Sequence, residues 1–216
     1  MKKTIFIFII SLFCLQLTGL AQKARIGLTG GMSIANLSRT IGGFDKDGNY
    51  RVGIAGGMLV DLPLGKKHKF SFQPSVDYVQ KGTGETPVFP INKAYIALRY
   101  AEVPVNFVFN KMWGKNTFYF GGGAYIAFNL PSKKVSHIPG NKIETDVSFG
   151  DQIANDLHGI DYGGDVIMGL RLNNGISASL HYTQGARNLV PVDNGNKIKN
   201  IAFGLRLGYM FKSQSK

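Results

Sequence analysis

The feature that most constrains this chain is a two-residue alternation of apolar side chains that recurs in segment after segment. The last segment shows it best, since one face would carry Ile201, Phe203, Leu205, Leu207, Tyr209 and Phe211. Successive side chains of a β-strand point to opposite faces of the sheet, so this period predicts strands with one apolar face. Abundant glycine and aromatic residues suit short strands and turns better than helices.

Eight such segments are expected, and they lie at residues 25–34, 52–62, 69–80, 94–109, 117–129, 159–172, 175–184 and 198–211. The connections run roughly 17, 6, 13, 7, 29, 2 and 13 residues, alternately long and short. Antiparallel neighbours joined in this way place every long loop at one end, and the tightest turn is expected at Asn173-Asn174-Gly175. The pattern predicts an all-β, eight-stranded antiparallel up-and-down barrel with short periplasmic turns and long extracellular loops.

Alternation is also compatible with a soluble barrel, and the distribution of lysine separates the two possibilities. Every lysine after residue 22 is expected in a loop, a turn, a strand end or a tail. A soluble barrel would need Lys and Glu along its wet outer face. This distribution favours a transmembrane barrel whose apolar face contacts lipid, and it disfavours a periplasmic lipid carrier.

The polar face would then line a narrow lumen that side chains fill. Its charged members are Arg25, Asp61, Asp77, Glu102, Asp161, Asp165, Arg171, His181 and Arg206. Unpaired buried charges cost several kcal/mol, so these groups are expected to form a structural charge network. A catalytic or proton-relay role is the alternative. Asp161 and Asp165 are a weak acid/base pair, because four residues of strand would separate them by about 13 Å.

Ser179 and His181 share a face, as the serine and histidine of lipid A deacylases do, but their parity points them inward rather than toward lipid. We therefore expect no catalytic residue, and we also expect no cofactor and no metal site. The repeated phrases Gly27-Leu-Thr-Gly-Gly-Met32 and Gly53-Ile-Ala-Gly-Gly-Met58 lack the Lys-Ser/Thr of a phosphate-binding loop. Paired glycines are instead expected to face each other, Gly30 with Gly56 or Gly31 with Gly57, where a small barrel bends tightly.

Aromatic residues are expected in two belts, as at the two interfaces of a membrane barrel. The short-turn belt would contain Phe70, Phe72, Phe107, Phe109, Trp113, Phe118, Phe120, Tyr209 and Phe211. The long-loop belt would contain Tyr78, Tyr95, Tyr100, Phe128 and Tyr182.

The first 21 residues have the pattern of a cleaved secretory signal, with Lys2 and Lys3, an apolar run and small residues before the cut. Residues 22–216 would form one barrel domain. The only cysteine, Cys14, lies in the signal, so the mature domain would contain no disulfide.

The formal net charge of +12 does not indicate nucleic-acid binding, because basic residues gather at the expected periplasmic end. Anionic phospholipid headgroups of the inner leaflet are the simpler partner for that basic rim. The barrel as a whole is expected to contact outer-membrane lipid and lipopolysaccharide. The longest expected loop, residues 130–158, is the best place for a protein partner or ligand. It holds Lys133, Lys134, His137, Asp146, Asp151, Asp156 and His158, at spacings that match no known metal motif.

The segment Leu98-Arg-Tyr-Ala-Glu-Val-Pro-Val-Asn-Phe107 resembles the fourth strand of PorT-like outer-membrane barrels of the Bacteroidetes, a group of small OmpA/OmpX-type barrels. Gly27-Leu-Thr-Gly-Gly-Met-Ser-Ile34 and Phe118-Tyr-Phe-Gly-Gly-Gly-Ala-Tyr125 are similar as well. The resemblance implies an outer-membrane location and insertion by the barrel assembly machinery. The strand order itself places both termini at the short-turn end, which is expected to be periplasmic. The founding member is associated with protein secretion, and most relatives have no assigned role.

These observations favour a non-enzymatic outer-membrane barrel that acts in structure, adhesion or assembly through its extracellular loops. A secretion-associated role is one form that this function could take. A small-solute channel would need a continuous void through the lumen. A lipid-modifying enzyme would need Ser, His and an acid clustered at one interface and facing lipid.

Overall fold

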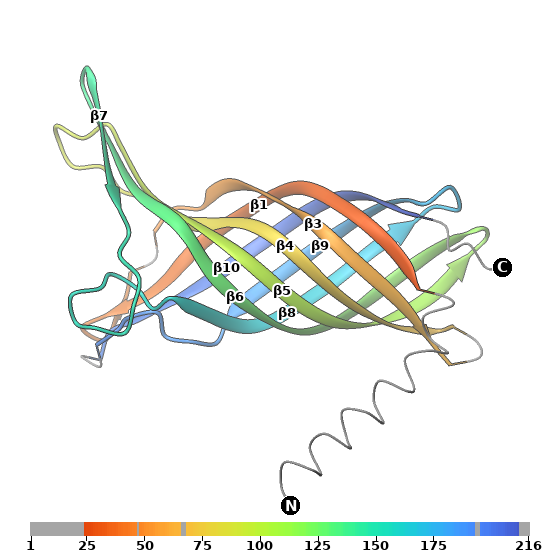
Figure 1. The fold of residues 1–216 in the computed structure, drawn as a ribbon. Coiled ribbons are helices and arrows are strands. Elements are labelled where there is room, and N and C mark those ends of the chain that lie inside the picture. Colours follow the sequence, from red (N-terminus) through yellow and green to blue (C-terminus); the bar gives the residue numbers. More distant parts are fainter. Residues whose placement is uncertain (1–23, 47, 66–67, 193–194, 212–216) are drawn as a thin grey trace, which may run out of the picture.

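The computed structural model describes residues 24–46, 48–65, 68–192 and 195–211 (Figure 1). The expected signal peptide lies outside the described residues. The long strands are β1 (Arg25–Ile41), β3 (Arg51–Leu64), β4 (Phe70–Glu85), β5 (Lys93–Trp113), β6 (Asn116–Ile138), β8 (Ile160–Arg171), β9 (Ile176–Gly185) and β10 (Lys197–Met210). Two short strands, β2 (Phe44–Asp45) and β7 (Asn141–Asp146), extend the long-loop end. No helix in this described part is long and apolar enough to cross a membrane.

The eight long strands form a closed antiparallel barrel, as predicted. Each pairs with its neighbours in chain order, and β10 pairs with β1 to close the ring. The offset of the ring is found by moving from each residue to its cross-strand partner, one strand after another. A path that starts at Tyr100 of β5 returns to the same strand at Asn110, ten residues further along the chain. Such an offset requires the strands to tilt by about 35–45° against the barrel axis.

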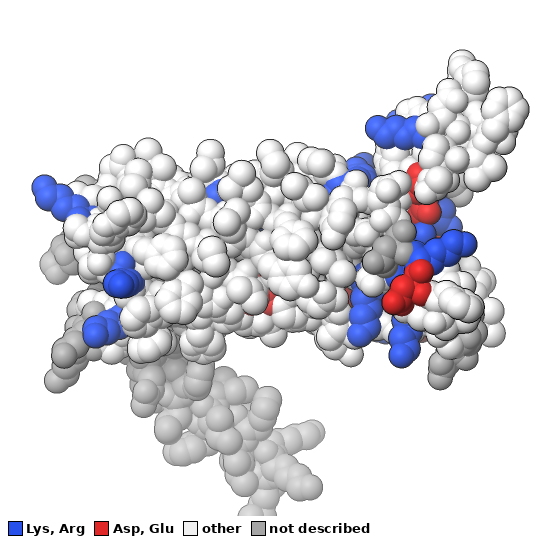
Figure 2. All heavy atoms as spheres, turned by 180° about the vertical axis from the view of Figure 1, so that it is seen from behind, with Lys and Arg blue, Asp and Glu red and all other residues white. Residues whose placement is uncertain are grey.

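The two faces of the wall differ as the alternation predicts. In β10, the apolar series from Ile201 to Tyr209 points outward, and Ala202, Arg206 and Met210 are buried inside. Exposed outward side chains on the other strands include Ile26, Leu28, Met32, Ile54, Met58, Val76, Phe107, Phe120, Val166 and Leu180. In Figure 2, the middle of the visible face is almost entirely free of charged side chains, which gather at both ends. The wall is therefore an apolar band between two polar rims.

The turns at one end of the barrel are short, and the connections at the other end are longer (Figure 1). The tightest turn was expected at Asn173-Asn174-Gly175, but the prediction was wrong. Trp113 and Asn116 face each other across only Gly114 and Lys115, with φ of +61° at the glycine. This turn needs only one residue in the left-handed region, which glycine adopts without strain.

The paired glycines of β1 and β3 adopt one of the two expected registers, in which Gly30 faces Gly56. Gly30 points outward, and a Cβ there would meet nothing within 4 Å. Gly31 points inward, and a Cβ there would lie 2.0 Å from the carbonyl oxygen of Leu205. Glycine is therefore required at Gly31 by the close approach of β10, whereas Gly30 is free of this constraint.

The expected loop 130–158 is partly a β-structure, which corrects its description as one long loop. β6 continues to Ile138 and turns into β7, which pairs with it from Lys133↔Asp146 to Ile138↔Asn141. β4 and β5 also continue beyond the barrel and remain paired up to Glu85↔Ala94. We call these extensions, residues 84–85, 93–95, 133–138 and 141–146, the arm, which rises from one side of the long-loop end (Figure 1).

Aromatic side chains line the outer face near the short turns. Ring pairs join Phe70 with Phe109, Phe109 with Phe120 and Phe118 with Phe120, at centroid distances of 5.4, 5.6 and 6.2 Å. Tyr100 is an exception to the expected long-loop belt, because its side chain is 1% exposed and points into the barrel. It shares the inward parity of Leu98 and Glu102, which strand alternation alone should have shown.

Candidate functional site

The layer of the lumen nearest the short turns is built around Asp61, whose carboxylate is fully buried. Its Oδ2 accepts hydrogen bonds from Arg25 Nη2 at 2.5 Å and from Arg171 Nη1 at 3.2 Å. Its Oδ1 accepts one from Gln73 Nε2 at 3.0 Å. The Arg171 guanidinium also lies 5.4 Å from the ring centroid of Tyr119. One carboxylate thus holds Arg25 of the neighbouring strand β1 and Arg171 of β8 from across the barrel.

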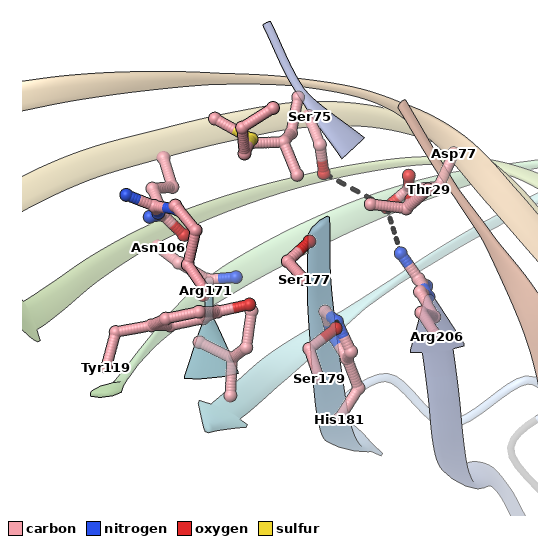
Figure 3. A pocket seen from close by; sticks show the side chains of 14 residues that line it. Thr29, Ser75, Asp77, Asn106, Tyr119, Arg171, Ser177, Ser179, His181 and Arg206 are labelled. Atoms are coloured by element: carbon pink, nitrogen blue, oxygen red, sulfur yellow. Dashed lines mark hydrogen bonds and ion pairs between the residues drawn. The ribbon is translucent and has the colours of Figure 1, made fainter. Parts of the chain in front are cut away.

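The next layer centres on Asp77, on which Arg206 and Ser75 converge in Figure 3. Asp77 Oδ2 accepts from Arg206 Nη1 at 2.8 Å and from Ser75 Oγ at 3.0 Å. Two inward glycines flank this pair. A Cβ on Gly57 would lie 2.3 Å from Asp77 Oδ1, and one on Gly31 would lie 2.8 Å from the Cα of Arg206. The glycines of the repeated phrase therefore leave room for the ion pair.

A second chain of contacts crosses the same level through Asp165. Its Oδ2 accepts from Asn106 Nδ2 at 2.6 Å and lies 3.6 Å from His181 Nδ1. His181 Nε2 in turn lies 3.2 Å from Ser179 Oγ. Gly123 faces both Asn106 and Asp165, so the absence of a side chain lets those two residues meet above it.

The order Ser179–His181–Asp165 has the connectivity of a nucleophile, a base and an orienting acid. Its surroundings do not suit that chemistry. Ser179 and Asp165 are 6% and 2% exposed inside the barrel, and the adjacent cavity of about 30 Å³ has room for about two waters. A lipid or ester substrate would not fit there without opening the wall.

Above this level, Glu102 forms an ion pair with a residue that the sequence analysis missed. Lys81 Nζ lies 2.5 Å from Glu102 Oε2, and the side chains are 0% and 1% exposed. The ammonium also lies 4.3 Å from the ring centroid of Tyr125 and 5.7 Å from that of Tyr100. A buried charge is tolerated here because a carboxylate and two aromatic faces surround it.

The expectation that no lysine lies within a strand is therefore wrong for Lys81, and also for Lys133 and Lys134, which lie within β6. The strand was expected to end at residue 80, but β4 continues to Glu85. Lys81 has the parity of Asp77, so its inward direction would have followed from a longer strand.

Asp161 lies in the same upper layer and is fully buried. Its Oδ2 accepts hydrogen bonds from Tyr125 Oη at 3.1 Å and Asn200 Nδ2 at 2.9 Å. Asn200 Nδ2 also lies 3.2 Å from Tyr100 Oη. Within the described residues no ion pair joins Asp161 to a basic side chain. Asp161 and Asp165 thus belong to separate groups of contacts.

The lumen is filled around these layers. The cavity of about 30 Å³ lies beside Asp77 and Ser179, and another of about 10 Å³ lies beside Glu102 and Thr183. At the short-turn end, a recess of about 250 Å³ reaches Arg171, which also lines the 30 Å³ cavity. Arg171 and the Asp61 layer therefore separate the recess from the interior.

At the long-loop end, the lumen is capped by an apolar cluster. Its buried members are Leu37, Leu98, Tyr100, Tyr125, Ala127, Val147, Leu157 and Leu189. Val147, Leu157 and Leu189 come from the connections rather than from barrel strands. The connections thus fold back over the barrel mouth and bury its upper polar layer.

The arm carries its own surface ion pairs. Glu144 contacts both Lys133 and Lys142, and these hydrogen bonds lower the pKa of Glu144 to about 2 and raise the pKa of Lys142. Because the pKa of Glu144 is depressed, its stabilising effect is present above its ordinary value of 4.5 and is lost as the pH falls toward 2.

Asp156 contacts Lys134, so the connection after β7 is bonded to β6. Burial raises the pKa of Asp156, but hydrogen bonds from Lys134 and Ser148 outweigh it and the net direction is downward. The carboxylates of Glu144 and Asp156 therefore remain ionised at neutral pH.

Comparison with known families gives one match. Residues 20–190 match the model described as "Outer membrane protein beta-barrel domain". A comparison with curated proteins returned no match.

Among solved structures, the attachment invasion locus protein Ail of Yersinia pestis aligns with a TM-score of 0.45 at 14% identity, covering 88% of this chain and 99% of Ail. The same protein with the heparin analogue sucrose octasulfate gives a TM-score of 0.43 at 14% identity and the same coverage. Neisserial surface protein A aligns with a TM-score of 0.45 at 10% identity, and the alignment covers 86% of this chain and 97% of the Neisserial chain.

Proposed function

Since this chain belongs to the family of outer membrane protein β-barrel domains, we propose that it is a sealed, non-enzymatic membrane anchor that presents the arm and neighbouring connections outside the cell. Its role would be adhesion or assembly through these surfaces. The long-loop end would be extracellular, and both termini would be periplasmic.

The contrast between the lumen and the long-loop end carries this proposal. Ion-paired layers fill the lumen, whereas four strands extend beyond the barrel at one end only. The most exposed apolar side chains at that end include Phe89 at 94% and Ile153 at 84%. Exposed apolar groups on a rigid scaffold are typical of surfaces that bind partners.

The orientation can be tested by labelling single cysteines on intact cells. The variant Asn141→Cys at the tip of the arm is expected to react with a membrane-impermeant maleimide. The matched variant Lys115→Cys, in an exposed short turn, should react only after the outer membrane is permeabilised. The opposite pattern would place the arm in the periplasm and overturn the proposed display of the arm outside the cell.

The channel alternative makes a different prediction for the purified protein. Folded barrels in planar bilayers are expected to show no stable conductance, because the Asp61 and Glu102 layers close the lumen. Steady unitary currents would instead support a small-solute channel. A heat-dependent shift on an unboiled gel would establish that the protein under test is folded.

A lipid-modifying enzyme is less well supported, because the Ser179–His181 pair faces the lumen. The finer assignment to PorT-like barrels, a secretion-associated role and a cleaved signal peptide remain part of the proposal. The proposal also includes three partners, which are the barrel assembly machinery, outer-membrane lipid and lipopolysaccharide.

A further inference from the structure

A group of basic side chains surrounds Tyr95 on the outer face, where the barrel wall continues into the arm. The Arg51 guanidinium carbon lies 5.3 Å from the ring centroid of Tyr95, and Lys93 Nζ lies 5.8 Å from it. The ring of His137 stacks on that of Tyr95 at 6.2 Å. We call this group, together with Arg99, the Tyr95 patch.

The patch belongs to the lipid-facing side of β5. Ile96, Leu98 and Tyr100 pack in the inner apolar cluster, so the residues of opposite parity, including Tyr95 and Arg99, face outward. Further down the same face, Val105 and Phe107 are exposed in the apolar band. The patch thus continues the surface that contacts lipid.

The position of the Tyr95 patch along the barrel axis matches the outer boundary of the apolar band. Arg99 lies eight residues beyond Phe107 along β5, which corresponds to roughly 20 Å along the axis of a tilted strand. The apolar band of such barrels is about 25 Å tall, so Arg99 is near its outer edge and Tyr95 and Lys93 are beyond it. Lipid headgroups occupy this level of the membrane.

The cations of the patch have no acidic partners among the described residues. Arg51 donates to the carbonyl of Lys81 at 3.2 Å, and Arg99 donates to the carbonyl of Pro131 at 3.3 Å. Arg51 and Arg99 are close enough for their charges to repel each other. The nearby Glu144 is already held by Lys133 and Lys142. The site therefore lacks an anion that would balance it.

We propose that the Tyr95 patch binds the phosphate group of an outer-leaflet glycolipid. The guanidinium groups of Arg51 and Arg99 can donate paired hydrogen bonds to phosphate oxygens, and Lys93 adds a point charge. The ring of Tyr95 holds Arg51 and Lys93 in place through cation–π contacts. A lipid is favoured over a soluble anion because the patch is continuous with the lipid-facing band. The inference rests on the proposed orientation, which places this rim in the outer leaflet.

The test compares lipid binding by folded barrels in detergent, measured as adducts in native mass spectrometry. The probes are bis-phosphorylated lipid A, dephosphorylated lipid A and inorganic phosphate. The variant Arg51→Gln/Lys93→Gln/Arg99→Gln is expected to bind the phosphorylated lipid at least tenfold more weakly than the unaltered protein. The control Lys46→Gln/Lys197→Gln/Lys199→Gln removes the same charge from other positions at this end and should bind within twofold of the unaltered protein.

Equal binding of the two lipid forms, or equal losses in the two triple variants, would overturn the proposal. If inorganic phosphate binds, the lipids do not, and the patch variant abolishes that binding, the claim that the ligand is a lipid would be overturned. Because the assay uses purified protein, its result is independent of the labelling on cells. A periplasmic arm with an intact lipid-binding patch would refute the orientation alone.

Discussion

Replacing Lys81 with methionine is expected to destabilise the barrel by about 3–5 kcal/mol, because Glu102 would remain buried without its cation. The pair is 2.5 Å apart and almost completely shielded from water. The measurement is urea-induced unfolding in phospholipid vesicles, followed by the fluorescence of Trp113, the only tryptophan.

Two further variants distinguish pairing from simple loss of packing. The double variant Lys81→Met/Glu102→Leu should recover most of the lost stability, since replacing a whole buried pair with apolar residues is often neutral. Lys133→Met disrupts a solvent-exposed pair of the arm and should leave the unfolding midpoint nearly unchanged, because water screens the charges. If the single and double variants at Lys81 are equally unstable, pairing does not explain the effect.

Adding one methyl group to Gly31 is expected to prevent a stable barrel, whereas adding it to Gly30 should be tolerated. In Gly31→Ala, the new Cβ would approach the Leu205 carbonyl oxygen to 2.0 Å, so β1 and β10 would have to move apart at the closing seam. Overpacking of this kind typically costs about 1–3 kcal/mol, and more when the backbone must shift. Gly30→Ala meets no atom within 4 Å, so the change should stay within about 0.5 kcal/mol.

The two alanine variants differ by one position in the same strand, so they have the same composition and nearly the same β-propensity. The fraction of each that migrates as a folded, heat-modifiable band after refolding would be compared. Gly57→Ala provides a second test from the neighbouring strand, since its Cβ would lie 2.1 Å from the Val76 carbonyl oxygen. Equal folding of Gly30→Ala and Gly31→Ala would show that the seam can relax.

Much of the barrel could be predicted because alternation is a local property. Each strand of eight or more residues repeats its inward and outward positions many times, so the faces of β10 and the inward direction of Arg206 follow from neighbours in the chain. The same parity would have placed Lys81 and Tyr100 correctly. Lys81 was missed because the expected strand ended one residue before it. Tyr100 was misplaced because it was assigned by its position along the strand and not by the face of the sheet to which its side chain points.

The partners of the inward residues depend on how the ring closes. Asp61 meets Arg171 across 110 positions of sequence, and Asp77 meets Arg206 across 129. Which side chains share a level is decided by the ten-residue offset of the closed ring and by the glycines that let strands approach. The cap of Val147, Leu157 and Leu189 and the arm are likewise tertiary, because connections lack the period that identifies a strand. Local patterning thus specifies which face each residue takes, and closure of the barrel decides what it meets there.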